Sequence, residues 1–301
     1  MPHRLPYYLA IAAVVGIIPL FFIDLGPYRR IFAPEVHAFG HLVFFAILAW
    51  VALQLPMVRR YSYPVRAVVV LVGAVLLGGM IELIQPYFGR SAAIKDVWQN
   101  LLGASITVAL SAPRGAARRI LVSVVAVVLF LEMHNPVTSL WDRGVARIQF
   151  PVLSDFSTAF EDRRWSSGTP DSSIARVGQR SLRVDLQPSR YAGTTMRRSF
   201  GDWNEHNTLE FSIYVPDGSL GITVSIRDHE HLDRGGAYID RFNRRFLLQP
   251  GWNDVSIPVA DIRDAPQERQ QDLSDIAELA IFTSNLEEER TFYLDRVRLR
   301  E

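Results

Sequence analysis

The sequence contains no cysteine among its 301 residues. This absence excludes disulfide bonds and thiolate metal sites, and it is compatible with either side of a bacterial membrane. The sequence also has little net charge, +1 at pH 7. A surface that binds nucleic acid needs a basic excess on one face. We therefore expect no nucleic-acid partner.

Signatures of the common catalytic sites are missing as well. The sequence has no G-x-S-x-G elbow, no P-loop and no dinucleotide fingerprint. Paired carboxylates of the glycosidase type could be assembled from several acidic residues, but the sequence does not place them at the separation that this chemistry needs. We therefore expect a non-catalytic protein, and an enzymatic role stays open.

Charged residues are scarce up to about residue 134, where apolar stretches alternate with short polar breaks. The chain from about residue 150 is polar, rich in Asp and Arg, and punctuated by Gly and Pro. A membrane-spanning helix needs about 20 mainly apolar residues. We predict an all-α transmembrane bundle in residues 1–134, a linker at 135–153 and a second domain at 154–301. The five predicted spans are 7–25, 38–55, 65–85, 94–110 and 120–133.

Basic residues in the short loops predict the orientation, because loops rich in Lys and Arg stay in the cytoplasm. Seven basic residues fall on the side of the amino terminus and four on the other side. Five spans then put the second domain outside the cytoplasmic membrane of a bacterial cell. The larger group is Arg4, Arg59, Arg60, Arg66, Arg114, Arg118 and Arg119, and the smaller is Arg29, Arg30, Arg90 and Lys95.

Polar residues interrupt the apolar pattern where the third predicted span ends and the fourth begins. Glu82 and Gln85 are three residues apart, and Asp96 and Asn100 are four apart, so each pair shares one helix face. Polar groups at membrane depth turn toward one another or toward a wet cavity. We therefore predict a polar cluster, open to the outside, that contains His41, Glu82, Gln85, Arg90, Asp96 and Asn100.

The same positions resemble the VanZ-like family of small integral membrane proteins over about residues 1–135. The resemblance rests on a His early in one helix, then E-x-x-Q, an Arg and D-x-x-x-N-x-x-G, which ends here at Gly103. It implies an envelope-associated membrane domain in contact with lipid and attaches no reaction to it. Two roles stay open for the cluster: hydrogen bonds that hold the helices together, or a site for a proton or a lipid headgroup.

The second half reads as short strands, because apolar residues alternate in runs that are separated by Gly, Pro, Asn and Asp. Strands at such regular spacing are typical of a β-sandwich. We predict an all-β jelly-roll sandwich. Its predicted strands are 181–186, 208–215, 221–228, 245–249, 254–259, 278–283 and 291–299.

Four short motifs in this half resemble, by their order, the jelly-roll domains of the carbohydrate-binding-module and galactose-binding-like type, over about residues 154–300. In that fold a calcium ion often joins the first and last strands, and Glu161 or Asp162 together with Asp295 could supply ligands. Ordinary surface carboxylates are the alternative. No other cofactor is expected. The motifs are Phe160-Glu161-Asp162, Gly178-Gln179-Arg180-Ser181-Leu182, Gly251-Trp252-Asn253 and Tyr293-Leu294-Asp295.

Recognition of a glycan needs exposed aromatic faces and planar polar groups in a groove. We expect Trp252 in the core instead, because large aromatic side chains in sandwiches usually pack there. The predicted ligand-binding residues are Trp203, Arg227, Asp228, His231, Arg241 and Asn243, with Tyr191 and Tyr238 as further candidates.

Together these features predict a membrane protein whose extracytoplasmic module binds envelope polysaccharide or a lipid-linked saccharide. The alternative is a membrane enzyme or lipid carrier that acts on a lipid-linked envelope precursor through the polar cluster. A module that only docks a neighbouring membrane protein is a third interpretation.

Overall fold

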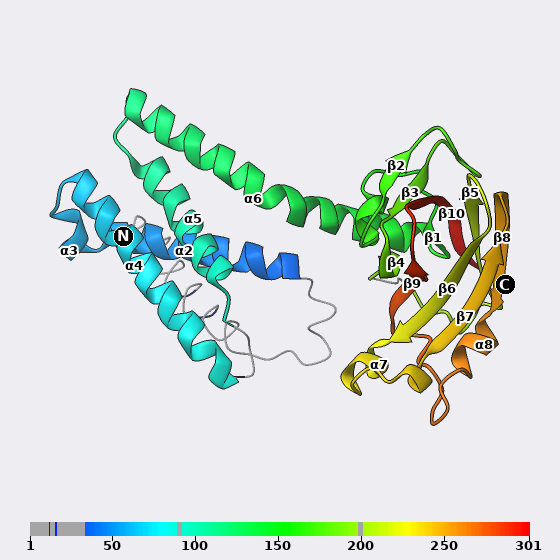
Figure 1. The fold of residues 1–301 in the computed structure, drawn as a ribbon. Helices are drawn as coiled ribbons and strands as arrows, with labels where there is room; N and C mark the ends of the chain where they lie inside the picture. Colours follow the sequence, from blue (N-terminus) through cyan, green and yellow to red (C-terminus); the bar gives the residue numbers. More distant parts are fainter. Residues whose placement is uncertain (1–11, 13–15, 17–33, 89–91, 198–200) are drawn as a thin grey trace. The chain divides into compact units, whose positions relative to one another are not determined.

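The computed structural model describes residues 12, 16, 34–88, 92–197 and 201–301. The chain divides into two compact units, Met1–Thr138 and Ser139–Glu301. The described part of the first unit is helical, and the second unit consists mainly of β-strands (Figure 1). The predicted order, a helical part followed by an all-β part, is confirmed.

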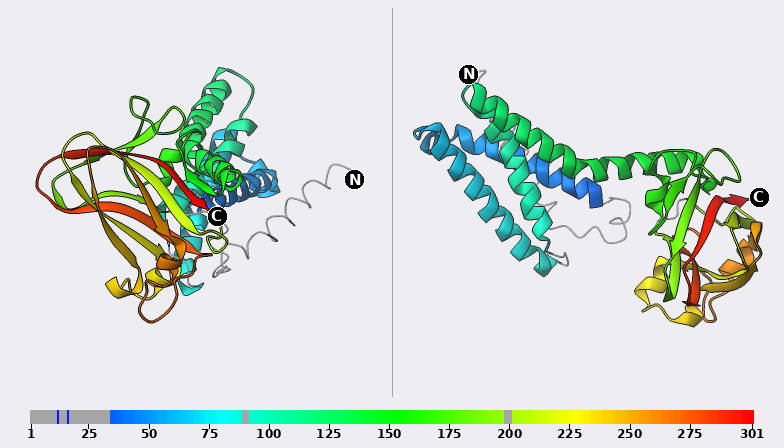
Figure 2. Two further views of the ribbon diagram at one scale, coloured as in Figure 1. Left: turned by 90° about the vertical axis from the view of Figure 1, so that its right-hand side faces the viewer. Right: turned by 45° about the horizontal axis from the view of Figure 1, so that its top comes forward.

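The helical unit is built around three helices, α2, α4 and α5, that lie together in the views of Figure 1 and Figure 2. They share a small apolar core that includes Phe44, Phe45 and Val108. A proline stands in the first turn of α3 and of α4, where its missing N–H costs no hydrogen bond. The elements are α2 (Pro34–Gln54), α3 (Pro56–Arg59), α4 (Tyr63–Ile84), η4 (Gln85–Phe88), α5 (Ile94–Ser111) and the first part of α6 (Ala116–Gln149).

Two glycines allow these helices to approach closely. Gly103 of α5 faces the backbone of Leu42 in α2, and a Cβ at position 103 would collide with the Leu42 carbonyl oxygen. Gly78 of α4 faces Asn100 of α5, and a Cβ there would lie 2.5 Å from Asn100 Nδ2. Small residues at such crossings are typical of helices that pack without a strong hydrophobic drive.

Two described helical segments, Tyr63–Phe88 and Ala116–Gln149, are long and apolar enough to cross a membrane, and Phe39–Gln54 is apolar but shorter. Four of the predicted spans fall on α2, α4, α5 and α6. The first predicted span, 7–25, lies outside the described residues apart from residues 12 and 16. That these helices cross a membrane stays a prediction.

Helix α6 runs through Pro136 to Gln149, so the predicted connector at 135–153 is helical over most of its length. Pro136 removes one backbone donor. The Thr138 hydroxyl donates to the carbonyl oxygens of His134 and Asn135, at 2.8 and 3.0 Å. The division between the two units falls inside this helix.

The second unit is a sandwich of two antiparallel sheets. The larger sheet has the order β2-β3-β10-β5-β8, and β1 pairs with β10. Its described strands are β1 (Val152–Ser154), β2 (Thr169–Asp171), β3 (Ser181–Leu186), β5 (Thr208–Val215), β8 (Gly251–Pro258) and β10 (Arg290–Arg300).

The smaller sheet has the order β4-β9-β6-β7 in the described part of the chain. Its strands are β4 (Ser189–Met196), β9 (Ile276–Leu286), β6 (Leu220–Asp228) and β7 (Phe242–Leu248), and short helical turns η5 (Glu161–Arg164), α7 (His229–Asp233), η6 (Tyr238–Asp240) and α8 (Val259–Arg263) lie in the connections. All seven predicted strands correspond to strands of the structure, whereas β1, β2 and β4 were not predicted.

One apolar core fills the space between the sheets. Alternate residues of each strand point inward, as in β3, where Leu182, Val184 and Leu186 are buried and Arg183 and Asp185 are exposed. This period of two leaves the opposite face of each sheet free to carry polar and aromatic side chains. The outer face of the smaller sheet carries the candidate site.

Candidate functional site

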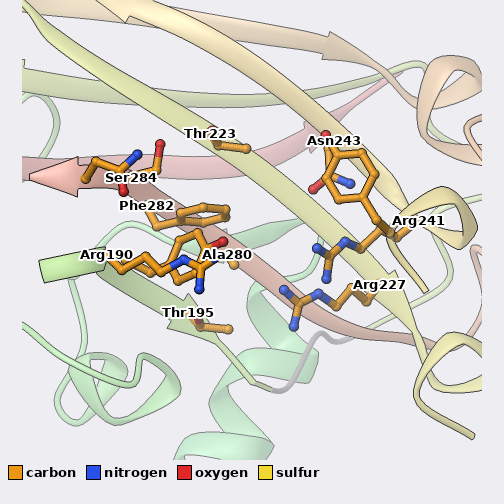
Figure 3. Close-up of a pocket in the computed structure, with 13 residues that line it drawn as sticks. Arg190, Thr195, Thr223, Arg227, Arg241, Asn243, Ala280, Phe282 and Ser284 are labelled. Carbon is orange, nitrogen blue, oxygen red and sulfur yellow. The ribbon is translucent and has the colours of Figure 1, made fainter. Parts of the chain in front are cut away.

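An open groove of about 760 Å³ crosses the outer face of the smaller sheet. It runs over β4, β9, β6 and the start of β7, and the loop that carries η6 contributes one edge (Figure 3). Paired strands bring its floor together, since Phe282 of β9 lies opposite both Gly193 of β4 and Thr223 of β6. Residues distant in the sequence therefore share one surface.

Among the described residues, three aromatic side chains line this groove: Tyr191, Tyr238 and Phe282. Tyr191 is 62% exposed and Tyr238 is 70% exposed. The ring of Tyr191 stands edge-on to that of Phe282, with their centroids 5.8 Å apart. A Cβ at Gly193 would collide with Phe282 and with the Ile281 carbonyl oxygen. Glycine at this position therefore permits the close approach of β4 to β9 at Phe282.

Hydrogen-bonding side chains surround the rings. The hydroxyl groups of Thr195, Thr223 and Ser284 and the amide of Asn243 line the groove, and all four are labelled in Figure 3. Such groups match the hydroxyls of a sugar, because hydroxyls and amides both donate and accept. The groove thus combines apolar faces with directional polar contacts.

Three arginines of the described part of the chain also line the groove (Figure 3): Arg190 from β4, Arg227 from β6 and Arg241 just before β7. Arg227 donates to Glu278 at 2.8 Å. The guanidinium carbon of Arg241 lies 5.4 Å from the Tyr238 ring centre, and that of Arg190 lies 5.4 Å from the Tyr191 ring centre. Burial, followed by the charge of Arg227, lowers the pKa of Arg241 from its usual value.

A buried ion network holds the loop that carries Tyr238 and Arg241. The guanidinium group of Arg269 donates to Asp228, with Nη2 2.8 Å from Oδ1, and its Nε donates to Asp240 at 2.7 Å. Asp228 also accepts backbone hydrogen bonds from His231 and Asp272, at 2.9 and 2.7 Å. His231 Nδ1 lies 2.8 Å from the Asp240 carbonyl oxygen. These contacts fix η6 at the edge of the groove.

The structure brings Arg227, Arg241 and Asn243 to the groove, but three other predicted ligand-binding residues do not line it. Trp203 is wrong as an exposed platform, because it lies fully buried in the core of the sandwich. Asp228 and His231 are also wrong as ligand contacts, because both are buried in the network with Arg269. Their role is to position the loop.

Trp252 differs from its predicted place as well. It is partly exposed, and its ring meets Tyr214 of the larger sheet, with the ring centroids 5.4 Å apart. Sequence reasoning also missed Phe282 and Arg190. Alternation in β9 could have found Phe282, since Leu279 and Ile281 are buried and residue 282 points the other way. Arg190 lies on β4, which was not predicted.

Glu161 and Asp295, the predicted calcium ligands, are both buried and do not fit a cation site. The Glu161 carboxylate accepts backbone hydrogen bonds from Asp155, Phe156 and Thr158 at 2.9 to 3.0 Å. Asp295 accepts from the backbone N–H groups of residues 176, 177 and 296 at 2.6 to 3.0 Å. Both carboxylates therefore already face N–H donors, where a calcium ion would need oxygen ligands.

Arg164 lies beside Glu161 and connects helix α6 to the strands of the sandwich within the second unit. Arg164 donates from Nη2 to Asp142 at 2.7 Å and from Nη1 to the Leu153 carbonyl oxygen at 2.7 Å. Its side chain is 1% exposed and lies 3.8 Å from Glu161. Burial raises the pKa of Glu161, but hydrogen bonds from Thr158 and the charge of Arg164 outweigh it and hold that pKa below its usual value.

The helical unit contains a second polar site. His41 Nδ1 lies 2.8 Å from Asn100 Oδ1, and His41 Nε2 lies 3.7 Å from Asp96 Oδ2. Glu82 Oε2 accepts a hydrogen bond from the backbone N–H of Ala93 at 2.8 Å. One ligand atom from each of His41, Glu82 and Asp96 lies within 4.8 Å of the others. An imidazole and two carboxylates at this spacing can share a proton or hold a divalent cation.

Two further residues, Gln85 and Arg90, were predicted as members of the polar cluster. Gln85 is fully buried in η4, directly after α4. Gln99, which was not predicted as a member, is also buried on α5. Arg90 lies outside the described residues.

The second unit is thus a β-sandwich with an open groove across its smaller sheet. Residues 158–301 match the family model Carbohydrate binding domain 30. No match to the VanZ-like family was found for the helical part. A search of curated proteins found no match.

Solved structures similar to this chain include two modules from Clostridium thermocellum. One is a family 11 carbohydrate-binding module in complex with a β-1,3-1,4-mixed-linked tetrasaccharide, with 16% identity, 50% of this chain and 94% of that chain covered, and a TM-score of 0.38. The other is a family 30 carbohydrate-binding module of a cellulosomal cellulase, with 18% identity, coverage of 45% and 82%, and a TM-score of 0.34.

Proposed function

We propose that this protein is a non-catalytic, membrane-anchored protein that binds a polysaccharide chain in the groove of its β-sandwich. The groove carries the proposal. It is open across the strands, so an extended chain can lie along it, and its exposed Tyr191 and Tyr238 rings suit stacking against sugar faces. The match of residues 158–301 to Carbohydrate binding domain 30 supports the same function.

The helical unit supports the membrane part of the proposal. In the most apolar stretch of Tyr63–Phe88, only 28% of the residues are buried, and the corresponding share in Ala116–Gln149 is 11%. The core helix of a soluble protein would be mostly buried, and neither segment is. Exposed Leu and Val side chains along α4 suit contact with lipid. Basic residues are more numerous on the side of the amino terminus, which favours the cytoplasm for that side. Five predicted spans then put the sandwich outside the cytoplasm. A reporter fused after Glu301 that works only in the cytoplasm would contradict this orientation.

A binding experiment with the full chain in detergent tests the groove. Immobilised bacterial envelope polysaccharides and soluble plant polysaccharides are probed with the wild type and with Tyr191→Ala. We expect the variant to bind about tenfold more weakly, because central aromatic contacts usually dominate such interfaces. The matched control is Tyr214→Ala, on the larger sheet, which should bind as the wild type does. Equal binding by the wild type and Tyr191→Ala would exclude this groove as the site.

The polar cluster in the helical unit favours a second candidate function: handling of a proton or of the headgroup of a lipid-linked envelope precursor. The observation behind it is the approach of His41, Glu82 and Asp96 within 4.8 Å. Ionisable groups in a membrane segment commonly mark such pathways. The test is Asp96→Asn and Glu82→Gln in the full chain. Loss of an envelope phenotype at normal protein level and thermal stability supports the function, whereas loss of the folded protein indicates a purely structural cluster.

A further inference from the structure

The groove carries more positive charge than recognition of a neutral sugar needs. Arg190, Arg227 and Arg241 all line it, and among the described lining residues none is Asp or Glu. Glu278 neutralises Arg227 across a 2.8 Å contact. Counting this carboxylate against the three guanidinium groups leaves an excess of two positive charges. No ion pair joins Arg190 or Arg241 to a carboxylate within the described part of the chain.

Two of these cations rest on aromatic rings of the groove itself. Arg190 lies over Tyr191 and Arg241 over Tyr238, each with 5.4 Å between the guanidinium carbon and the ring centre. This arrangement orients planar donors beside the rings on which a sugar would stack. In Figure 3, Arg227 and Arg241 extend into the groove from one side, and Arg190 enters from the other. Charge and stacking surfaces therefore share one binding site.

The surroundings of Arg241 disfavour its positive charge. The side chain is partly buried, and the Arg227 guanidinium lies close enough to oppose its charge, so that the pKa of Arg241 is lowered. A bound anion would relieve both effects, since a guanidinium group binds a carboxylate or sulfate through two parallel hydrogen bonds. A neutral glycan has no negative charge with which to do so.

On the basis of the proposed function, we infer that the groove selects an anionic polysaccharide, one whose sugars carry carboxylate or sulfate groups. The stacking rings bind the sugar faces, and the excess arginines bind the acidic substituents. The rings give affinity for a chain of either kind, and the arginines decide between charged and uncharged chains.

The test compares chains that share a backbone and differ in charge. Polygalacturonate is compared with fully methyl-esterified polygalacturonate, and carboxymethyl cellulose with hydroxyethyl cellulose, using the full chain in detergent. We expect each charged chain to bind at least tenfold more tightly than its neutral partner. Salt should weaken that binding, because exposed charge pairs are screened. Dextran sulfate against dextran then separates sulfate from carboxylate recognition.

Variants assign the selectivity to the groove. Arg241→Gln and Arg190→Gln should each weaken binding to polygalacturonate by about tenfold and leave binding to the methyl ester nearly unchanged. Arg183→Gln, on the outer face of the larger sheet, is the control and should change neither. Tyr191→Ala should weaken both.

The outcomes separate this inference from the proposed function. Equal, salt-insensitive binding of charged and neutral chains would overturn the anionic selectivity and leave the polysaccharide-binding function intact. Absence of binding to every chain would overturn both. Selective binding that survives Arg241→Gln and Arg190→Gln would place the acidic site elsewhere and would also overturn the inference.

Discussion

The two units distribute polar and apolar side chains in opposite ways. In the sandwich the buried core is apolar and includes Leu182 and Val297, and most charged side chains are at the surface. In the described part of the helical unit, Leu76, Leu83 and Phe130 are 67 to 74% exposed, whereas Gln85 and Asn100 are fully buried. Exposed apolar patches of this kind mark contact with something other than water. This contrast is the one expected if, as proposed, the helices lie in lipid and the sandwich lies in water.

The units also stabilise their interiors differently. The sandwich closes its buried charges into networks, such as Arg164 with Asp142 and Arg269 with Asp228. The helices depend on close approach at small residues, and Gly103 touches the backbone of Leu42. We therefore expect the sandwich to lose more stability when a buried charge loses its partner than when a small residue is enlarged. We expect the opposite order in the helical unit.

The largest expected effect comes from Arg164→Met. Removal of the guanidinium group leaves the Asp142 carboxylate buried without its partner, which should lower the free energy of unfolding of the sandwich by about 3–5 kcal/mol. Denaturant unfolding of the full chain in detergent, followed by tryptophan fluorescence, measures it. Arg183→Met removes an exposed partner of Asp185 and should leave stability nearly unchanged. Equal stability of Arg164→Met and wild type would refute the importance of this network.

An added methyl group should have the next largest effect in the helical unit. Gly103→Ala forces α5 away from the Leu42 carbonyl oxygen, and overpacking of this kind costs about 1–3 kcal/mol. At Gly73 of the neighbouring α4, an added Cβ meets no atom within 4 Å. Gly73→Ala should therefore preserve stability or raise it by about 0.5–1 kcal/mol. Thermal loss of helical circular dichroism in detergent compares them, and the reverse order would contradict the close packing of α2 and α5.

Acid should have the smallest of these effects on stability, and it should act on the sandwich. The pKa values of Glu161 and Asp228 are held below their usual values in the folded sandwich, because hydrogen bonds and nearby arginines outweigh burial. Their stabilising contribution is present above the unfolded pKa of about 4 and is lost as the pH falls through the folded pKa. Asp295 has the opposite sign, since burial raises its pKa and its contribution is lost as the pH rises.

We therefore expect the free energy of unfolding of the sandwich to fall below about pH 4. Glu161→Gln should flatten that fall, as measured by denaturant unfolding at each pH. Glu287→Gln, at an exposed position, should leave the profile unchanged. A wild-type profile that is flat from pH 3 to pH 5 would show that these carboxylates are not coupled to folding.

Local patterns predicted most of the elements. Seven strands were predicted because large apolar residues alternate along them, and β3 was predicted with the bounds Ser181–Leu186 that the structure has. Strand β4 was missed because its sequence, SRYAGTTM, has small and polar residues where alternation would show. Since β4 supplies Arg190, that residue of the groove was missed as well, and Tyr191 was a candidate without the strand that positions it.

The site residues show why local patterns are insufficient. Trp203 and Trp252 both follow turn-like segments, yet one lies in the core and the other is partly exposed. Asp228 and Arg227 are neighbours on one strand, and the period of two turns Arg227 to the groove and Asp228 to the buried network. The partner Arg269 is 41 residues away from Asp228, so no local pattern could reveal the pairing.

The sequence by itself determined the division into an apolar helical part and a β-rich part, and it determined which faces of the strands point inward, because burial follows the local period of 3.6 or 2 residues. It also placed Glu82 with Gln85 and Asp96 with Asn100 on shared helix faces. Only the tertiary structure decided which outward faces meet. Strand pairing joins Phe282 to Gly193 and Thr223, and helix packing brings His41 to Asn100, since these contacts depend on residues far apart in the chain.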